Sequence, residues 1–251
     1  MVWSFSRLNS FYTCPYEFYL HYIECNPGTN SFFGQYGSFI HKILEMYEKD
    51  EISIFDISQY YEDNFDAFVT EKAPYNKYSD IRQSYYEKGL DYLDNIDLIL
   101  DKYEVLGVEK EIHFKIGDYD MIGYIDLLLR DKESKAIIIL DHKSASLKFK
   151  KSGEISKTSL PHFLEFKRQL YLYSMPVIKE YGKVDFLEWN MFKDRKHIKV
   201  EWDEAEYKEA IQWAHDTVKL IEQEKAWFPN PDYYYCNNLC GQRRSACEYK
   251  A

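Results

Sequence analysis

Residues 123–129 read GYIDLLL and residues 137–145 read IIILDHKSA, and these two stretches decide how the chain folds. Each contains an apolar run of strand length, and a charged segment at residues 130–135 separates them. Asp126 interrupts the first run, and the second run ends on Asp141, His142 and Lys143. An ionised carboxylate inside an apolar strand is costly unless it is paired or binds a cation, so Asp126 is the first candidate functional residue.

The two-residue period of a strand places Asp141 and Lys143 on the same face. If the two strands form a hairpin about residues 130–135, residue 126 should face roughly residue 139, with Asp141 as a diagonal neighbour about 7–8 Å away. Two carboxylates at this spacing can share one Mg²⁺, and a lysine beside them can hold a water or stabilise developing negative charge. The alternative is a buried Asp–Lys ion pair that only closes the strand.

The pattern around these stretches predicts an α/β fold, a small mixed sheet flanked by helices. We expect one domain over residues 1–251, with a mainly helical part (1–104), a sheet-and-helix part (105–202), and a last helix with a cysteine-rich tail (203–251). Pro15 should kink the first helix, and Pro74 should break a helical stretch. The expected helices cover residues 35–49, 57–102, 163–179 and 203–224, and the expected strands cover 108–116, 121–129, 136–143, 184–192 and 197–202.

Composition sets the limits of this interpretation. With 251 residues, 45% of them hydrophobic, the chain can bury a sizeable core. The longest apolar run, residues 136–140, is far too short to cross a bilayer, and the first residues lack the pattern of a signal peptide, so we expect a cytoplasmic protein without a membrane partner. Aromatic residues are abundant, but composition does not identify which of them could stack on bases.

The net charge of −10 argues at first against a polyanionic partner, but the charge is uneven. Residues 143–168 contain seven Lys or Arg and only two acidic residues. Lys148, Lys150 and Lys151 lie in this segment, directly after the Asp141–Lys143 motif. We interpret them as contacts for phosphates, and the alternative is an ordinary solvated loop.

Five cysteines are present, and an odd number without a secretory signal argues against a disulfide framework. Three of them, Cys236, Cys240 and Cys247, crowd into the last part of the chain, which points to metal or cluster ligation. Cys14 and Cys25 lie near the other end, and we expect Cys25 to be a packing residue.

The two opening stretches resemble the RecB-type branch of the PD-(D/E)XK nuclease superfamily, and the similarity extends along nearly the whole chain. His41 in GSFIHKILE is similar to the helical histidine that this branch uses at its metal site, although it could instead pair with Glu45. Glu109 in GVEKEI matches the acidic strand residue, with Glu111 and an exposed strand carboxylate as alternatives. Gln169 and Tyr173 in RQLYLYS match the Q-x-x-x-Y motif near the DNA backbone, with ordinary helix surface as the alternative.

In the same branch, resembling AddB-type and CRISPR-adaptation nucleases, four cysteines often bind a [4Fe–4S] cluster. Cys14, Cys236, Cys240 and Cys247 match these ligands in order. Three residues separate Cys236 from Cys240, where the family commonly has two. A Cys₄ zinc site and free thiols are the alternatives.

The resemblance implies an enzyme that holds Mg²⁺ or Mn²⁺ with His41, Asp126 and Asp141. Its catalytic residues would be Glu109, Asp126, Asp141 and Lys143, and it would hydrolyse DNA with single-stranded character, as an exonuclease. It implies work in recombination, repair or phage- or CRISPR-type DNA processing, with a separate helicase or recombination protein as partner. Two functions from other classes compete with this one. The chain could be a non-catalytic DNA-binding recombination subunit, or an RNA-processing module with the nuclease fold.

Overall fold

The computed structural model describes residues 2–96 and 100–249, which form two compact units. The first, which we call the sheet unit, contains residues 2–5 and the described part of 95–216. The second, the helical unit, contains residues 6–94 and the described part of 217–251.

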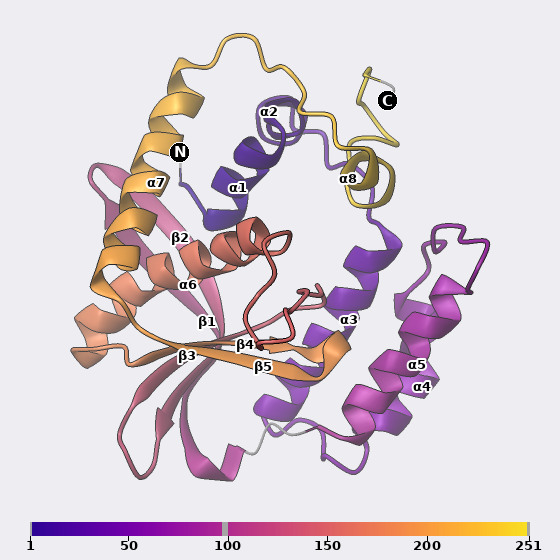
Figure 1. Ribbon diagram of the computed structural model, residues 1–251, viewed down its shortest axis with the longest axis vertical. Coiled ribbons are helices and arrows are strands. Elements are labelled where there is room, and N and C mark those ends of the chain that lie inside the picture. Colours follow the sequence, from indigo (N-terminus) through magenta and orange to yellow (C-terminus); the bar gives the residue numbers. More distant parts are fainter. Residues whose placement is uncertain (1, 97–99, 250–251) are drawn as a thin grey trace. The chain divides into compact units, whose positions relative to one another are not determined.

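The sheet unit is built on one five-stranded sheet in the order β1-β2-β3-β4-β5 (Figure 1). Long apolar runs make the middle strands, and all six residues of β3 are buried. Neighbouring strands pair antiparallel except β3 and β4, which are parallel. The strands are β1 (Tyr103–Ile116), β2 (Tyr119–Asp131), β3 (Ile137–His142), β4 (Phe186–Met191) and β5 (Lys196–Glu201).

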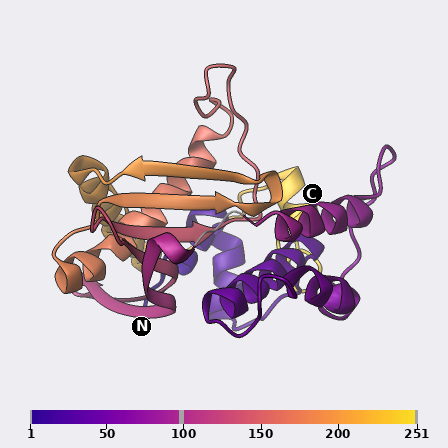
Figure 2. The same ribbon diagram turned by 90° about the horizontal axis from the view of Figure 1, so that it is seen from below.

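Helix α6 (Leu160–Tyr181) makes the crossover that two parallel strands require, and it contacts β1, β3 and β4 (Figure 1). Pro161 occupies its first turn, and Gly182 ends it with a left-handed φ of 82°. Figure 2 shows the loop between β3 and α6 extending away from the sheet. A mixed sheet with flanking helices confirms the predicted α/β fold class.

The hairpin register between β2 and β3 differs from our expectation by two residues. Leu128 pairs with Ile139 and Leu127 with Leu140, and one further step puts Asp141 directly opposite Asp126. The turn lies later than expected because the Asp131 carboxylate accepts hydrogen bonds from the backbone of residues 133 and 134, while Lys135 takes a left-handed φ of 61°. The two carboxyl-bearing residues are therefore direct rather than diagonal neighbours.

The helical unit contains α1 (Phe5–Thr13, which starts in the sheet unit), α2 (Pro15–Phe18), α3 (Phe32–Glu48), α4 (Ile57–Phe68), α5 (Ile81–Asp94) and α8 (Tyr233–Asn238). Pro15 starts α2 at its first position, so the first helix breaks at Cys14 as predicted. A π-helical turn, η1 (Tyr19–Ile23), follows. Short 3₁₀ turns are η2 (Leu100–Lys102) and η3 (Phe192–Asp194), and α7 (Glu204–Gln223) runs from the sheet unit into the helical unit.

The helical stretch expected over residues 57–102 is interrupted by a longer loop than a single break at Pro74. Residues 69–80 form a loop between α4 and α5. Asn76 folds back to accept a hydrogen bond from Tyr78 N (2.8 Å), and Asp80 accepts one from Gln83 N (3.0 Å) at the start of α5. Residues 97–99 of the expected helix lie outside the described residues.

No helix in the described part of the chain has both the length and the apolar character to cross a membrane.

Candidate functional site

Three carboxylates meet where β1, β2 and β3 run side by side in the sheet unit. A carboxylate oxygen of Glu109 lies within 4.8 Å of one of Asp126. Asp126 Oδ2 also accepts a hydrogen bond from the backbone N of His142 (2.7 Å), which ties it to the residue after Asp141. Asp141 is only 3% exposed. Closely spaced, partly buried carboxylates are the donor set that a hard divalent cation takes.

Glu109 lies between the paired positions Val108–Leu127 and Lys110–Ile125, which puts it opposite Asp126. It has a φ of 47°, a left-handed conformation that is uncommon for a residue with a side chain. Strand alternation put Glu111 on the same face, but Glu111 is used elsewhere: it accepts a hydrogen bond from Tyr124 Oη (2.9 Å) and pairs with His113 (2.7 Å). The structure therefore brings Glu109, and not Glu111, to Asp126.

Lys143 lies beside Asp141 and is held from two sides. Its Nζ is 2.7 Å from Asp141 Oδ2 and donates to Gln169 Oε1 at 2.9 Å. The same ammonium lies 5.2 Å from the centre of the Phe166 ring. These contacts keep a positive charge next to the carboxylates, in a side chain that is only 20% exposed.

Tyr173 lies one turn after Gln169 on α6, and the two side chains hydrogen-bond each other. The Tyr173 ring packs directly on β2, since a Cβ at Gly123 would lie 2.5 Å from the ring. Burial, and next the Asp141 carboxylate, raise the pKa of Tyr173, so it stays a neutral phenol. Tyr173 is only 5% exposed, so it is not ordinary helix surface, and Gln169 links it to Lys143.

The close carboxylates perturb one another. Burial, and next the neighbouring Asp141, raise the pKa of Asp126 to about 7, although the His142 amide and Lys143 act in the opposite direction. A bound cation would offset the repulsion between the Asp126 and Asp141 carboxylates and so stabilise the ionised form of Asp126. The residues present therefore fit a divalent metal such as Mg²⁺ or Mn²⁺.

His41 lies on α3, in the helical unit, and Asp126 lies in the sheet unit. The alternative partner of His41, Glu45, pairs with Lys49 at 2.5 Å and with Lys42 at 3.8 Å. A role for His41 at the metal site stays a prediction.

The basic residues after β3 lie on the loop that leads to α6. Lys148 and Lys151 are exposed, and Lys150 forms an ion pair with Glu154 (2.8 Å). A bridge between Phe149 and Ile155 gives the loop a hairpin shape, and the Lys196 ammonium lies 4.2 Å from the centre of the Phe149 ring. The loop therefore has a defined form, with Lys148, Lys150 and Lys151 exposed on it.

The four cysteines singled out in the sequence surround one cavity in the helical unit. Its volume is about 390 Å³, and Cys14, Cys236, Cys240 and Cys247 all line it. Burial, and next the Glu17 carboxylate, raise the pKa of the Cys240 thiol to about 12, and burial also raises the pKa of Cys247. Burial of these thiols disfavours their thiolate form unless a positive charge lies beside them.

Cys25 does not line this cavity, and the expectation that it packs in the core is wrong. Its side chain is exposed, and its backbone has a left-handed φ of 56°. The chain turns here after the π-helical segment, which directs the side chain away from the core.

The sequence interpretation missed two polar residues at the cysteine cavity. Glu17 and Tyr235 both line it, and the Tyr235 hydroxyl donates to Glu17 Oε2 at 2.7 Å. Burial is the first cause that raises the pKa of each. Glu17 could have been found from its helical spacing, three residues after Cys14, but Tyr235 gave no such signal.

A second missed pair lies next to the carboxylates. His142 and Asn190 are buried, and their side-chain nitrogens Nδ1 and Nδ2 lie 3.0 Å apart. They face each other in register on β3 and β4, so this polar pair links the end of the Asp141 strand to its parallel neighbour.

Comparison with known proteins assigns the family. A model of the PD-(D/E)XK nuclease superfamily matches residues 2–251, so the chain belongs to this superfamily of hydrolytic nucleases, which typically use divalent metals. Among solved structures, a protein from Eubacterium rectale described as a "putative exonuclease" has a similar fold, with a TM-score of 0.55 and 12% identity. That match covers 100% of this chain and 90% of the other. No curated protein matches the chain.

Proposed function

We propose that this protein is a divalent-metal-dependent DNA nuclease, acting as an exonuclease, whose active centre is formed by Glu109, Asp126, Asp141 and Lys143. The observation that carries the proposal is the meeting of Glu109 and Asp126, within 4.8 Å, beside an Asp141–Lys143 pair at 2.7 Å. A nucleic-acid substrate follows from the superfamily. A purely structural ion pair between Asp141 and Lys143 would not need the Glu109 carboxylate beside Asp126.

The carboxylates would hold Mg²⁺ or Mn²⁺, which when bound supplies a Lewis acid for the phosphoryl oxygen and acidifies water. Lys143 carries the positive charge that the chain itself contributes. Asp141 and Gln169 hold its ammonium in place, so it can orient the attacking water or stabilise the negative charge that develops on the phosphate. Tyr173 fixes Gln169 from the other side and remains protonated.

The finer assignments belong to the same proposal. His41 would add a ligand to the metal, as in the RecB-type branch that the chain resembles. Gln169, Tyr173 and the loop with Lys148, Lys150 and Lys151 would position the phosphate backbone. We further propose that both units act as one nuclease domain, which is supported by a family match over residues 2–251. A separate helicase or recombination protein would supply DNA with single-stranded character.

For the cysteine cavity we propose a [4Fe–4S] cluster bound by Cys14, Cys236, Cys240 and Cys247. Four cysteines around one cavity support this proposal. A cavity of about 390 Å³ is far larger than one zinc ion needs, because zinc holds its sulfur ligands at about 2.3 Å. The cluster would be structural, because none of its four cysteine ligands is among the residues assigned to the active centre.

The decisive experiment is a cleavage assay on end-labelled single-stranded DNA, duplex DNA and RNA with Mg²⁺, Mn²⁺, Ca²⁺ or EDTA. We expect DNA to be degraded from its ends with Mg²⁺ or Mn²⁺ only. Asp126→Asn and Asp141→Asn should abolish cleavage with little change in shape. Full activity in EDTA would refute the metal-dependent mechanism. Binding of DNA without cleavage would favour the recombination subunit, and cleavage of RNA alone would favour the RNA-processing module.

A further inference from the structure

The loop between α4 and α5, residues 69–80, carries aromatic and basic side chains that the proposed active centre does not use. Tyr75 is 92% exposed and Tyr78 is 83% exposed. Other aromatic residues of the helical unit, such as Phe39 and Tyr61, pack against one another in its core. Figure 2 shows the loop extending beyond the ends of α4 and α5. We infer that this loop binds a single-stranded segment of DNA by stacking bases on Tyr75 and Tyr78.

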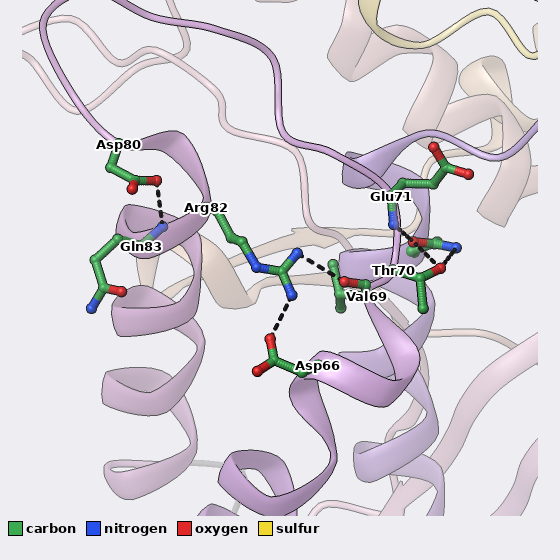
Figure 3. A network of polar contacts seen from close by, with 8 residues as sticks. Asp66, Val69, Thr70, Glu71, Asp80, Arg82 and Gln83 are labelled. Atoms are coloured by element: carbon green, nitrogen blue, oxygen red, sulfur yellow. Dashed lines mark hydrogen bonds and ion pairs between the residues drawn. The ribbon is translucent and has the colours of Figure 1, made fainter.

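The base of the loop is fixed at both ends. Arg82 donates to Val69 O at 2.8 Å and to Asp66 Oδ1 at 2.6 Å, which joins α5 to the end of α4 (Figure 3). Gln35 on α3 accepts a hydrogen bond from Glu71 N at 2.7 Å and also contacts the Thr70 hydroxyl. The loop is therefore held by three helices, and such preorganisation lowers the entropy cost of binding.

The charges of the loop are arranged for an anionic partner. Asp66 is paired with Arg82, Glu71 lies 3.7 Å from Arg244, and Asp80 accepts the hydrogen bond from Gln83 N. Lys72 and Lys77 have no acidic partner among the residues that the structure describes. Lys77 instead lies 4.7 Å from the centre of the Tyr78 ring. Asp66 and Glu71 are thus offset by arginines, and Lys72 and Lys77 belong to the same loop as the exposed rings of Tyr75 and Tyr78.

Exposed aromatic rings together with lysines fit a single strand better than a duplex. Every base has a flat face that can stack on a tyrosine, whereas a duplex hides these faces within its own stack. Lysines beside the rings can contact the phosphates that join the stacked nucleotides. A hollow of about 1020 Å³ lies along the loop, and Lys72, Tyr75 and Lys77 are among the residues that line it. Its size is at the upper end of that of pockets that hold a whole small ligand.

This inference rests on the proposed function only in taking DNA as the substrate. Its test measures binding of the full chain to fluorescent oligothymidylate in Ca²⁺, so that no cleavage is needed. Tyr75→Ala and Tyr78→Ala should each weaken binding about tenfold, which is within the range of base–aromatic stacking. Tyr75→Phe and Tyr78→Phe should retain affinity, because the rings remain. The matched control is Phe55→Ala, which removes a ring that is 91% exposed outside this loop.

Binding to blunt duplex DNA should change little in the Tyr75→Ala/Tyr78→Ala protein. Unchanged oligothymidylate affinity in that double variant would overturn the inference, and so would an equal loss in Phe55→Ala. A wild-type protein that binds the oligonucleotide through the loop but cleaves nothing would refute the proposed nuclease and leave the binding loop standing. A wild-type protein that cleaves DNA, with unchanged binding in the double variant, would refute the binding loop alone.

Discussion

Asp126 illustrates at the scale of one residue how a reactive centre costs stability. Its carboxylate accepts a hydrogen bond from His142 N and lies beside Asp141 and Glu109. Burial and the neighbouring Asp141 raise its pKa to about 7. Without a cation, ionisation of this group therefore opposes folding.

The sign of this effect gives a prediction for Asp126→Asn in the absence of metal. An acid whose pKa is higher in the folded than in the unfolded protein makes the folded state less stable as pH rises from about 4 to about 7. The amide variant avoids this loss and can still accept the His142 hydrogen bond. We expect it to be more stable than wild type by about 1–3 kcal/mol at pH 8, and nearly equal at pH 4.

Thermal unfolding in EDTA at the two pH values measures this difference. Mg²⁺ should then raise the melting temperature of the wild type more than that of Asp126→Asn, because only the wild type keeps both carboxylates. A variant that is less stable than wild type at pH 8 would contradict the proposed repulsion.

Lys143 is the second residue whose role can be separated from folding. Lys143→Ala should lower the turnover number by roughly 10²–10³-fold, the usual effect of removing one electrostatic stabiliser. Metal affinity should change much less, because the carboxylates remain. Gln169→Ala is the matched variant: Lys143 keeps its Asp141 contact at 2.7 Å, so activity should fall by a smaller factor. Single-turnover kinetics would measure the cleavage rates of both variants. A wild-type cleavage rate in Lys143→Ala would show that Lys143 has only a structural role.

At the scale of secondary-structure elements, the loop between β3 and α6 joins the strand that carries Asp141 to the helix whose Gln169 accepts a hydrogen bond from Lys143. Lys148, Lys150 and Lys151 on this loop are all exposed, and Lys150 is in addition paired with Glu154. These lysines come directly after the Asp141–Lys143 motif in the sequence, and we expect them to contact the phosphate backbone of bound DNA. Their contribution should therefore be electrostatic and independent of sequence.

Replacing Lys148 and Lys151 together by Ala should weaken DNA binding equally for different sequences. The slope of log K against log salt should become shallower by about 0.7 for each lost contact on single strands. Lys150→Ala should have a smaller effect because Glu154 already offsets its charge. Titrations over a range of salt concentrations provide the measurement, with Lys208→Ala on α7 as the control. An unchanged slope in the double variant would return the segment to an ordinary solvated loop.

For the whole molecule, the cysteine cavity connects distant parts of the chain within the helical unit. Cys14 meets the tail cysteines there, and the Tyr235–Glu17 hydrogen bond spans 218 positions. A covalent or metal connection over such a distance can stabilise a fold by about 5 kcal/mol, since it restricts the unfolded chain. A bound cluster would therefore act mainly on the stability of this unit.

Cys240→Ser should consequently lose the cluster and melt at a lower temperature, while Cys25→Ser, at an exposed position, should change neither. Protein purified without oxygen should contain about four irons per chain. Iron analysis and thermal unfolding test both points. Stoichiometric zinc without iron would replace the cluster by a Cys₄ zinc site, and unchanged stability in Cys240→Ser would exclude a stabilising role for either.

The sequence by itself determined the α/β class, most of the strands, and Asp126, Asp141 and Lys143 as the central candidates. These features are local: an apolar run of strand length, or a charge inside such a run, can be recognised from neighbouring residues alone. The expected hairpin between β2 and β3 was also correct in kind. Its register was not, because the position of the turn depends on hydrogen bonds from the Asp131 carboxylate.

Only the tertiary structure decided the features that depend on residues far apart in the chain. It selected Glu109 over Glu111, because a Glu109 carboxylate oxygen lies within 4.8 Å of Asp126 while Tyr124 and His113 engage Glu111. It also gathered Cys14 with the tail cysteines and identified Tyr75 and Tyr78 among the many aromatic residues as exposed. Burial, and contact between residues that are far apart in the sequence, arise from tertiary packing, and local sequence patterns do not contain that information.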